Sequence, residues 1–152
     1  MDKNAHFEMF ENTPTCNMDL RLFYEKMVEE NKLDKVFFDG SMRDVQDFTN
    51  FVKENTWFFF GFDRYSLVGG VWFTHFLENS CQIHICSFCG YNHTRFQKPI
   101  KKLLDFILDN KSFMCYKIIA KTPYKGIARK YQDFGFEYKG YEDGRYIIEV
   151  SK

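Results

Sequence analysis

The spacing of apolar residues predicts how the first part of the chain folds. Residues 6–10 have an extended pattern, and residues 12–15 form a turn. Residues 19–33 have helical spacing, with one face made of Leu20, Phe23, Met27 and Val28. Residues 35–38 resemble a short strand. A capping-box segment at residues 41–44 then opens a second helix, whose apolar stripe is Val45, Phe48, Phe51 and Val52.

The middle of the chain is dense in aromatic residues and predicts three sequential strands. Residues 56–62 and 67–76 are apolar runs, and the polar residues 63–66 between them predict a hairpin turn. A second turn at residues 78–80 leads into a third strand at residues 81–88. These strands form an antiparallel meander.

Helical and extended patterns alternate again in the last third. A helix begins near Lys98 and buries a face made of Ile100, Leu103, Leu104, Ile107 and Leu108. Residues 113–121 predict a fifth strand of the sheet, which a helical crossover allows to run parallel to the preceding strand. Residues 124–134 form another helix, and Gly135 is its expected C-terminal cap.

The chain closes with a predicted hairpin, residues 136–139 and 145–150, across a turn at residues 142–144. The length of 152 residues suits one domain, 1–152, and the composition is 45% hydrophobic and 20% aromatic. Such a chain should fold into a compact globule.

Charge and cysteine content exclude some classes of protein. Basic and acidic residues both number 21, so the formal net charge is zero and nothing global suggests a nucleic-acid or membrane partner. The apolar runs are far shorter than a membrane span, and the N-terminus lacks the apolar region of a signal peptide. We therefore expect a cytoplasmic protein. Five cysteines, mostly within apolar strand patterns, are expected to be reduced, partly buried thiols.

One stretch has the pattern of a ligand platform. In residues 81–108 an apolar strand leads through a basic loop into an amphipathic helix. Free backbone N–H groups and the positive end of the helix dipole meet at such a helix start, which suits an anion such as phosphate. This stretch is the first candidate for a binding site.

The order of elements resembles the Gcn5-related N-acetyltransferase (GNAT) superfamily over nearly the whole chain. Its most specific signature lies in residues 124–136, where Tyr131 precedes the pair Gly135-Phe136 by four residues, as in the family's late helix. Tyr124 stands where the family usually has Asn. Aromatic residues on a helix face before a glycine also occur in other α/β proteins, but the position of this segment favours the family. The resemblance implies an α/β (α+β) fold with a mixed, mostly antiparallel sheet of about seven strands flanked by about four helices.

The second signature is the loop that wraps the coenzyme A pyrophosphate in this superfamily. With Arg95 in its first place, Lys98 and Ile100 occupy the two positions where the family has Gly or Ala, and Pro99 removes an amide donor. We hypothesise that Arg95, Lys98 and Lys101 bind phosphate through their side chains. The alternative is a solvated basic helix start. The residues expected to bind acetyl-CoA are Phe88, Cys89, Gly90, Arg95, Phe96, Gln97, Lys98, Ile100 and Lys101.

The resemblance also implies chemistry: direct transfer of an acetyl group from acetyl-CoA to a primary amine of a small molecule or protein. By resemblance, Tyr131 protonates the departing thiolate, and a backbone N–H between Phe88 and Gly90 polarises the carbonyl. The family's fourth and fifth strands splay apart, which leaves the edge of the fourth strand free for the pantetheine amides.

His84 is the first candidate for the general base, because an imidazole titrates near neutral pH and the residue lies in the strand beside the expected thioester. A hydrogen-bonded structural histidine is the alternative interpretation. His75 and Glu78 on the preceding strand are further candidates, as is a water relay.

Two other interpretations concern the same stretch. His84, Cys86, Cys89 and His93 offer four zinc ligands in ten residues, but their spacing is not a standard zinc pattern, so no metal is expected. A redox role for Cys86 and Cys89 is disfavoured because this pair does not open a helix.

The alternative function is a catalytically degenerate GNAT-fold protein that binds a partner or small ligand. The missing glycines favour it, whereas Tyr131 opposes it. Early aromatic residues either line an acceptor pocket or belong to the core: Trp57, Phe59, Tyr65, Trp72 and Phe76. An exposed aromatic surface would also support a homodimer.

Overall fold

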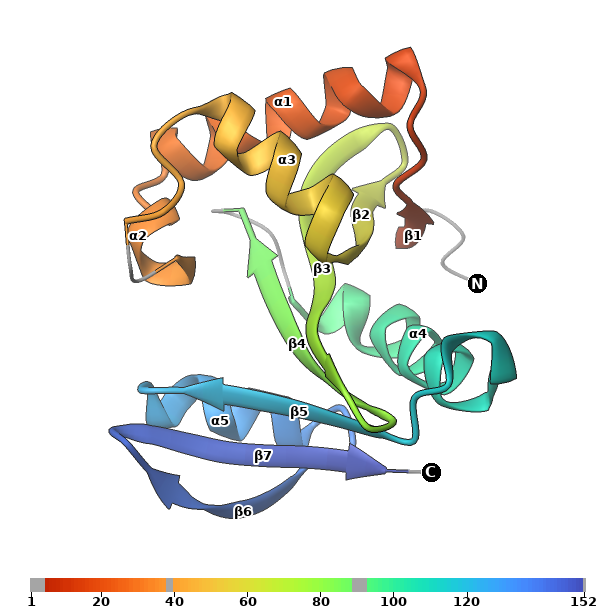
Figure 1. Cartoon of the computed structure of the whole chain (residues 1–152), viewed down its shortest axis with the longest axis vertical. Helices are drawn as coiled ribbons and strands as arrows, with labels where there is room; N and C mark the ends of the chain where they lie inside the picture. Colours follow the sequence, from red (N-terminus) through yellow and green to blue (C-terminus); the bar gives the residue numbers. More distant parts are fainter. Residues whose placement is uncertain (1–4, 38–39, 89–92, 152) are drawn as a thin grey trace. The chain divides into compact units, whose positions relative to one another are not determined.

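The structure is a computed structural model that describes residues 5–37, 40–88 and 93–151 (Figure 1). The strands are β1 Ala5–Met9, β2 Trp57–Asp63, β3 Ser66–Leu77, β4 Ser80–Ser87, β5 Lys117–Thr122, β6 Glu137–Glu142 and β7 Arg145–Ser151. The helices are α1 Pro14–Glu29, α2 Leu33–Val36, α3 Val45–Asn55, α4 Gln97–Asp109 and α5 Lys125–Gln132, with short 3-10 helices η1 His93–Phe96 and η2 Lys111–Phe113. None of the helices in these ranges is long and apolar enough to cross a membrane.

The strands form one mixed sheet in the order β1-β2-β3-β4-β5-β7-β6. Strand β4 pairs parallel to β5, and α4 lies in the connection between them, as a parallel crossover requires. The pairs β1–β2, β5–β7 and β6–β7 are antiparallel. The predicted mixed, mostly antiparallel sheet of seven strands is confirmed.

The chain divides into two compact units. The first contains Met1–Trp72 and His84–His93, and the second contains Phe73–Ile83 and Thr94–Lys152. Strands β3 and β4 each run from one unit into the other.

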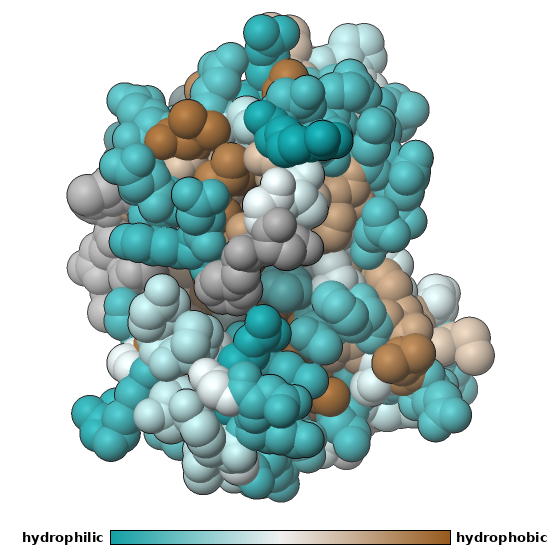
Figure 2. Space-filling model, turned by 60° about the vertical axis from the view of Figure 1, so that its left-hand side comes forward, coloured by the Kyte–Doolittle hydropathy of each residue, from teal (hydrophilic) through white to brown (hydrophobic). Residues whose placement is uncertain are grey.

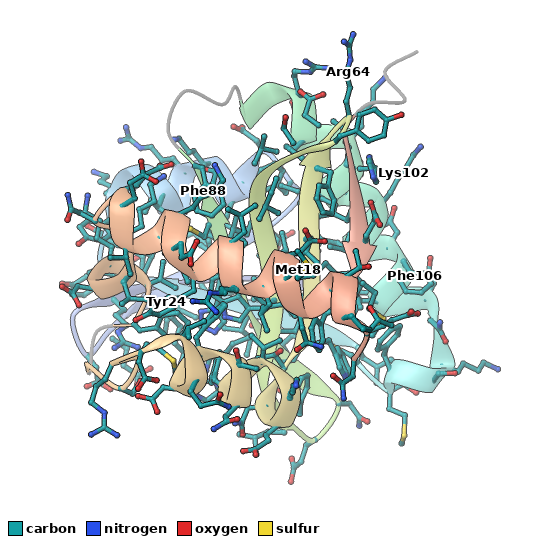
Figure 3. All side chains as sticks on the ribbon, turned by 90° about the horizontal axis from the view of Figure 1, so that it is seen from above. Met18, Tyr24, Arg64, Phe88, Lys102 and Phe106 are labelled. Carbon is teal, nitrogen blue, oxygen red and sulfur yellow. The ribbon has the colours of Figure 1, made fainter. Side chains whose placement is uncertain are left out.

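The core of the first unit is built from aromatic rings. Figure 3 shows α1 and α3 side by side across the strands. Phe23 of α1 is fully buried, and its ring packs edge-on against Phe58 at 5.2 Å and Phe88 at 5.0 Å. The buried residues of this core are Leu20, Phe23, Met27, Phe48, Val52, Phe58, Phe60, Phe62, Leu67, Trp72, Cys86 and Phe88. The apolar spacing that predicted both helices therefore reflects one shared core, except at Val28, which was predicted on the apolar face of α1 and is exposed.

The second unit has two helices with buried faces. All five residues predicted for the apolar face of α4 are buried, while Lys101, Lys102 and Asp105 are exposed. Helix α5 packs against β5 and β7 (Figure 1). The hairpin β6–β7 turns at Asp143 and Gly144, both with positive φ, which is typical of tight hairpin turns.

Four predictions of local structure are wrong. Residues 35–38 do not form a strand: α2 is a short helical turn, because the amides of Val36 and Phe37 bond back to the carbonyls of Lys32 and Leu33. Phe38 lies outside the described residues. The described residues contain five α-helices, where about four were predicted, and the additional one is α2, which the sequence pattern assigned to a strand.

Helix α1 begins at Pro14 and ends at Glu29, rather than spanning residues 19–33. Thr13 is its N-cap, with Oγ1 accepting from the Cys16 amide at 3.2 Å, and proline suits the first helical position. The predicted turn at residues 12–15 is instead this helix start.

Strand β5 begins at Lys117, four residues later than predicted, because residues 111–113 form η2 and Met114 follows in the left-handed conformation. The other predicted strands and helices agree with the structure within two residues, apart from the edges of the last hairpin. Asp44 caps α3 by accepting from the Asp47 amide at 2.8 Å, so the helix start predicted there is confirmed.

Candidate active site

The end of β4 is held closely against β3 in the first unit. The Phe88 amide donates to the Val68 carbonyl at 2.9 Å. A Cβ added to Gly69 would lie 2.5 Å from the Cys86 carbonyl oxygen, so only glycine allows this approach of the two backbones. Because backbone groups alternate along a strand, the Ser87 N–H and C=O point away from β3.

This geometry bears on the predicted carbonyl-polarising amide. The Phe88 N–H is already bonded to β3, so it is not available to an acetyl oxygen in this arrangement. Cys89 and Gly90, the other two residues predicted for this role, lie outside the described residues. A polarising amide from that pair stays a prediction.

The register between β4 and β5 is short. It consists of three pairs, from Ser80 with Lys117 to Gln82 with Ile119, although β4 continues to Ser87 and β5 to Thr122. The predicted use of the β4 edge by pantetheine concerns the part of β4 beyond this register.

Two lysines from the α1 side reach the end of β4. The Lys32 ammonium donates to the Ser87 carbonyl and lies 3.7 Å from a Glu30 carboxylate oxygen. Lys26 Nζ lies 5.5 Å from the centroid of the Phe88 ring, a cation–π distance. Figure 3 shows Phe88 beside α1. Sequence analysis did not select these lysines, because their approach to β4 depends on tertiary contacts.

Cys86 lies beneath this strand end and is buried. Burial is the main cause that raises the pKa of its thiol to about 12; the nearby Lys32 ammonium lowers this pKa in part, and the Glu30 carboxylate adds a smaller rise. The Cys86 side chain is therefore a neutral thiol at physiological pH, which agrees with its assignment to the core.

His84, the predicted base, lies against the aromatic core. Its ring stacks on Trp72, with centroids 5.8 Å apart and an interplanar angle of 16°. His75 and Glu78 are exposed residues of the second unit with positive φ, and His75 Nδ1 lies 2.7 Å from Thr74 Oγ1. A catalytic role for any of the three stays a prediction.

The start of α4 in the second unit is cationic. Its first turn carries Lys98 and no acidic residue, although a helix start by itself favours acidic side chains. Of the residues predicted to contact coenzyme A, Arg95, Gln97, Lys98 and Lys101 are exposed. Phe96 and Ile100 are buried, so their side chains belong to the core and only their backbones remain as contacts.

A hydrogen bond joins the start of α4 to the end of α5. Gln97 Nε2 donates to the Asp133 carbonyl at 3.3 Å, two residues after Tyr131. Tyr131 is only 7% exposed, and its ring packs edge-on against Phe134 and Phe136. Burial raises the pKa of the Tyr131 hydroxyl well above its ordinary value. The phenol therefore keeps its proton at neutral pH.

In the residues that the structure describes, no group of three or more His, Cys, Asp and Glu side chains could hold a metal ion. Cys89 and the side chain of His93 lie outside that description, so the expectation of no metal at His84, Cys86, Cys89 and His93 stays a prediction. Of the aromatic residues considered for an acceptor pocket, Trp72 and Phe59 belong to the core, whereas Tyr65 is 99% exposed. The face shown in Figure 2 is largely hydrophilic, with hydrophobic residues in small groups.

Comparison with known proteins identifies the fold. No protein-family model matches the chain, and no curated protein sequence matches it. Solved structures do match. The N-acetyltransferase PseH of Campylobacter jejuni has a TM-score of 0.65 at 12% identity, over 98% of this chain and 99% of that one.

Two further matches were solved with ligands. Spermidine N-acetyltransferase from Vibrio cholerae, in complex with CoA and spermine, has a TM-score of 0.73 at 14% identity, over 97% of this chain and 95% of that one. The aminoglycoside acetyltransferase AAC(6')-Ib, in complex with ribostamycin and coenzyme A, has a TM-score of 0.74 at 12% identity, over 99% and 94% of the two chains. The chain therefore has the GNAT fold, as its order of elements predicted.

Proposed function

We propose that this protein is an N-acetyltransferase that moves an acetyl group from acetyl-CoA to a primary amine by direct transfer. The observation that carries the proposal is Tyr131. By resemblance it corresponds to the family's leaving-group acid; in support, it lies on α5 between β5 and the closing hairpin, and its burial keeps the phenol protonated. A proton donor is what a departing thiolate needs.

The start of α4 supports coenzyme A as the co-substrate. Lys98 in the first turn and the preceding Arg95 place positive charge where a helix alone would favour acidic residues. A bound pyrophosphate accounts for this choice, because ammonium and guanidinium groups bind phosphate directly. Lys98 and Ile100 replace the glycines that allow backbone amides to approach the pyrophosphate, so cationic side chains supply part of the phosphate binding.

The roles in catalysis follow from the chemistry of thioesters. The amine attacks the acetyl carbon, a backbone N–H after β4 polarises the carbonyl, and Tyr131 protonates the coenzyme A thiolate. His84 or a water relay removes the proton of the amine. The pantetheine amides pair with the β4 edge beyond Gln82.

The acceptor belongs to the class of primary amines. Two of the matching structures contain spermine or ribostamycin, both of which carry primary amines. The formal net charge of zero gives this chain no global attraction for a polycation. We extend the proposal to a cytoplasmic protein that acts on a small molecule or a protein side chain, as a monomer or homodimer.

A GNAT-fold binding protein without catalysis is the second candidate, and the replacement of both loop glycines by Lys98 and Ile100 favours it. Calorimetric titration with acetyl-CoA tests the phosphate grip. We expect Arg95→Ala and Lys98→Ala each to weaken binding by about 1 kcal/mol, roughly five-fold, since both side chains are exposed. Lys102→Ala, further along the exposed face of α4, is the matched control. Unchanged affinity in both variants contradicts the side-chain grip.

Thiol release with a panel of primary amines separates the two candidates. Binding of acetyl-CoA without release for any amine favours the binding protein, whereas amine-dependent release establishes the transferase.

A further inference from the structure

Lys32 is placed by the way α1 ends. Asn31 has a φ of 56°, and its amide bonds to the Val28 carbonyl at 3.1 Å. The Lys32 amide bonds to the Met27 carbonyl at 2.8 Å. Together these bonds form the Schellman arrangement, which reverses the chain after a helix. Backbone geometry therefore fixes where the Lys32 side chain begins, and the side chain extends to β4.

The Lys32 ammonium is held by two oxygens. Nζ donates to the Ser87 carbonyl and lies 3.7 Å from Glu30 Oε1. Since the adjacent Phe88 amide is bonded to β3, the Ser87 carbonyl lies on the opposite edge of β4. This is the edge to which the proposed function assigns pantetheine. A primary ammonium group is thus already present at the end of the strand.

We propose that Lys32 is an acetyl acceptor, and that the protein acetylates the Nζ of Lys32 from its own bound acetyl-CoA. The inference rests on the proposed function, because it needs a thioester at the end of β4. A carbonyl and a carboxylate are the partners that hold an incoming ammonium group. Here the chain itself supplies the amine that they hold.

The reaction balances without a further reagent. Lys32 gives one Nζ proton to the Glu30 carboxylate, and the freed lone pair forms a bond to the acetyl carbon. The carbon–sulfur bond breaks, and the coenzyme A thiolate takes up a proton from the general acid of the proposed function. The nitrogen then loses its second proton, which returns through water to the deprotonated general acid, and becomes a neutral amide, while Glu30 releases to water the proton that it took. Acetyl-CoA and the ammonium form of Lys32 thus yield acetyl-lysine, coenzyme A and one proton.

Lys26 is the matched comparison. Its ammonium also reaches the end of β4, but it lies 5.5 Å from the centroid of the Phe88 ring, whereas the Lys32 ammonium donates to a backbone carbonyl. A lysine that is acetylated merely because it is near β4 would include Lys26. A lysine that is acetylated because the Ser87 carbonyl and Glu30 hold it would be Lys32 alone.

The test incubates the full chain with acetyl-CoA and no amine, and follows the intact mass and the peptide map. We expect one acetyl group on Lys32, added at a rate constant independent of protein concentration because the reaction is intramolecular. Lys32→Arg keeps the positive charge but removes the amine, and it should lower the rate of acetylation by at least about ten-fold, because a positioned acceptor reacts faster than one that is not positioned. Lys26→Arg should react like the wild type.

The inference is overturned by acetyl groups scattered over exposed lysines, as in heat-unfolded protein, or by an equal rate in Lys32→Arg. Thiol release with free primary amines runs in parallel. Amine-dependent release without modification of Lys32 overturns self-acetylation and leaves the transferase standing. Absence of acetyl-CoA binding in calorimetry overturns the proposed function, and self-acetylation with it.

Discussion

Gly69→Ala tests the close approach of β3 and β4 beside the proposed site. The added Cβ would lie 2.5 Å from the Cys86 carbonyl oxygen and 3.1 Å from Ser87 Cα, while ordinary contact begins at 3.4 Å. Both atoms belong to the backbone, so no side chain can move aside. One strand must shift by nearly an ångström, and the hydrogen bond from the Phe88 amide to the Val68 carbonyl weakens with it.

The expected cost follows from these contacts. Overpacking of this kind costs about 1–3 kcal/mol, and we expect the upper part of that range, about 2–3 kcal/mol, because a backbone hydrogen bond is affected as well. For a chain of 152 residues the unfolding entropy is about 0.3 kcal/mol per degree, so the melting temperature should fall by about 6–9 °C.

Thermal unfolding followed by circular dichroism measures this shift. Gly126→Ala in α5 is the matched control, because a Cβ there meets no atom within 4 Å. Because Gly126 is the second residue of α5, its replacement by alanine should leave stability unchanged or raise it by less than the roughly 0.5–1 kcal/mol that applies to a helix interior. A folded Gly69→Ala protein that melts within a degree or so of the wild type would refute the reasoning about strand contact.

Three further predictions concern single side chains. Tyr131→Phe should fold and lower amine-dependent thiol release by about 10²–10⁴-fold. Burial raises the pKa of Tyr131 above the ordinary 10.0, so the stability of the wild type should fall as the pH rises above about 10, by about 1.4 kcal/mol per pH unit more than that of the variant. An equal loss of stability in the two proteins between pH 10 and pH 11, measured by chemical denaturation, would contradict this. Cys86, whose thiol has its pKa raised to about 12 by burial, should resist iodoacetamide at pH 8 until the protein unfolds, whereas the half-buried Cys16 reacts. Peptide mass mapping measures both alkylation rates, and equal rates for the two thiols would be the contrary result. Thr13→Ala should cost about 1 kcal/mol, or about 3 °C, through loss of the hydrogen bond from the Cys16 amide, and a calorimetric melt at the wild-type temperature would argue against that cap.

The sequence was most informative where one face of an element is buried. The spacing of Ile100, Leu103 and Ile107 predicted the buried face of α4, and all three are buried in the structure. The dense aromatic run around Phe58 to Phe60 predicted β2 for a different reason: consecutive residues there are all buried, as in a strand that is covered on both faces. The fold class followed from the order of such elements.

In two places, local hydrogen bonds produce a structure that differs from the one that the apolar and polar pattern predicted. Lys35 to Phe37 has the composition of a strand, but bonds to the carbonyls of Lys32 and Leu33 close a helical turn instead. At the start of α1, Thr13-Pro14 has the composition of a turn, yet the same two residues form a favourable helix cap. Apolar spacing does not distinguish these outcomes, because few side chains are involved.

The candidate site was only partly predictable. Tyr131 and the cationic start of α4 could be located from motif and charge. The contact of Lys32 with the Ser87 carbonyl could not, because it joins residues 55 positions apart through a reversal of the chain at Asn31. The hydrogen bond from the Phe88 amide to β3 depends on strand alignment, which local sequence patterns do not predict either.

The central claim is that the chain transfers acetyl groups with Tyr131 as the proton donor to the leaving thiolate. Release of free thiol from acetyl-CoA, measured with a panel of primary amines for the wild type and for Tyr131→Phe, tests it most directly. We predict amine-dependent release by the wild type that falls at least about a hundred-fold in the variant. Folded wild-type protein that binds acetyl-CoA and releases no thiol with any amine, or a variant that reacts as fast as the wild type, would contradict the account.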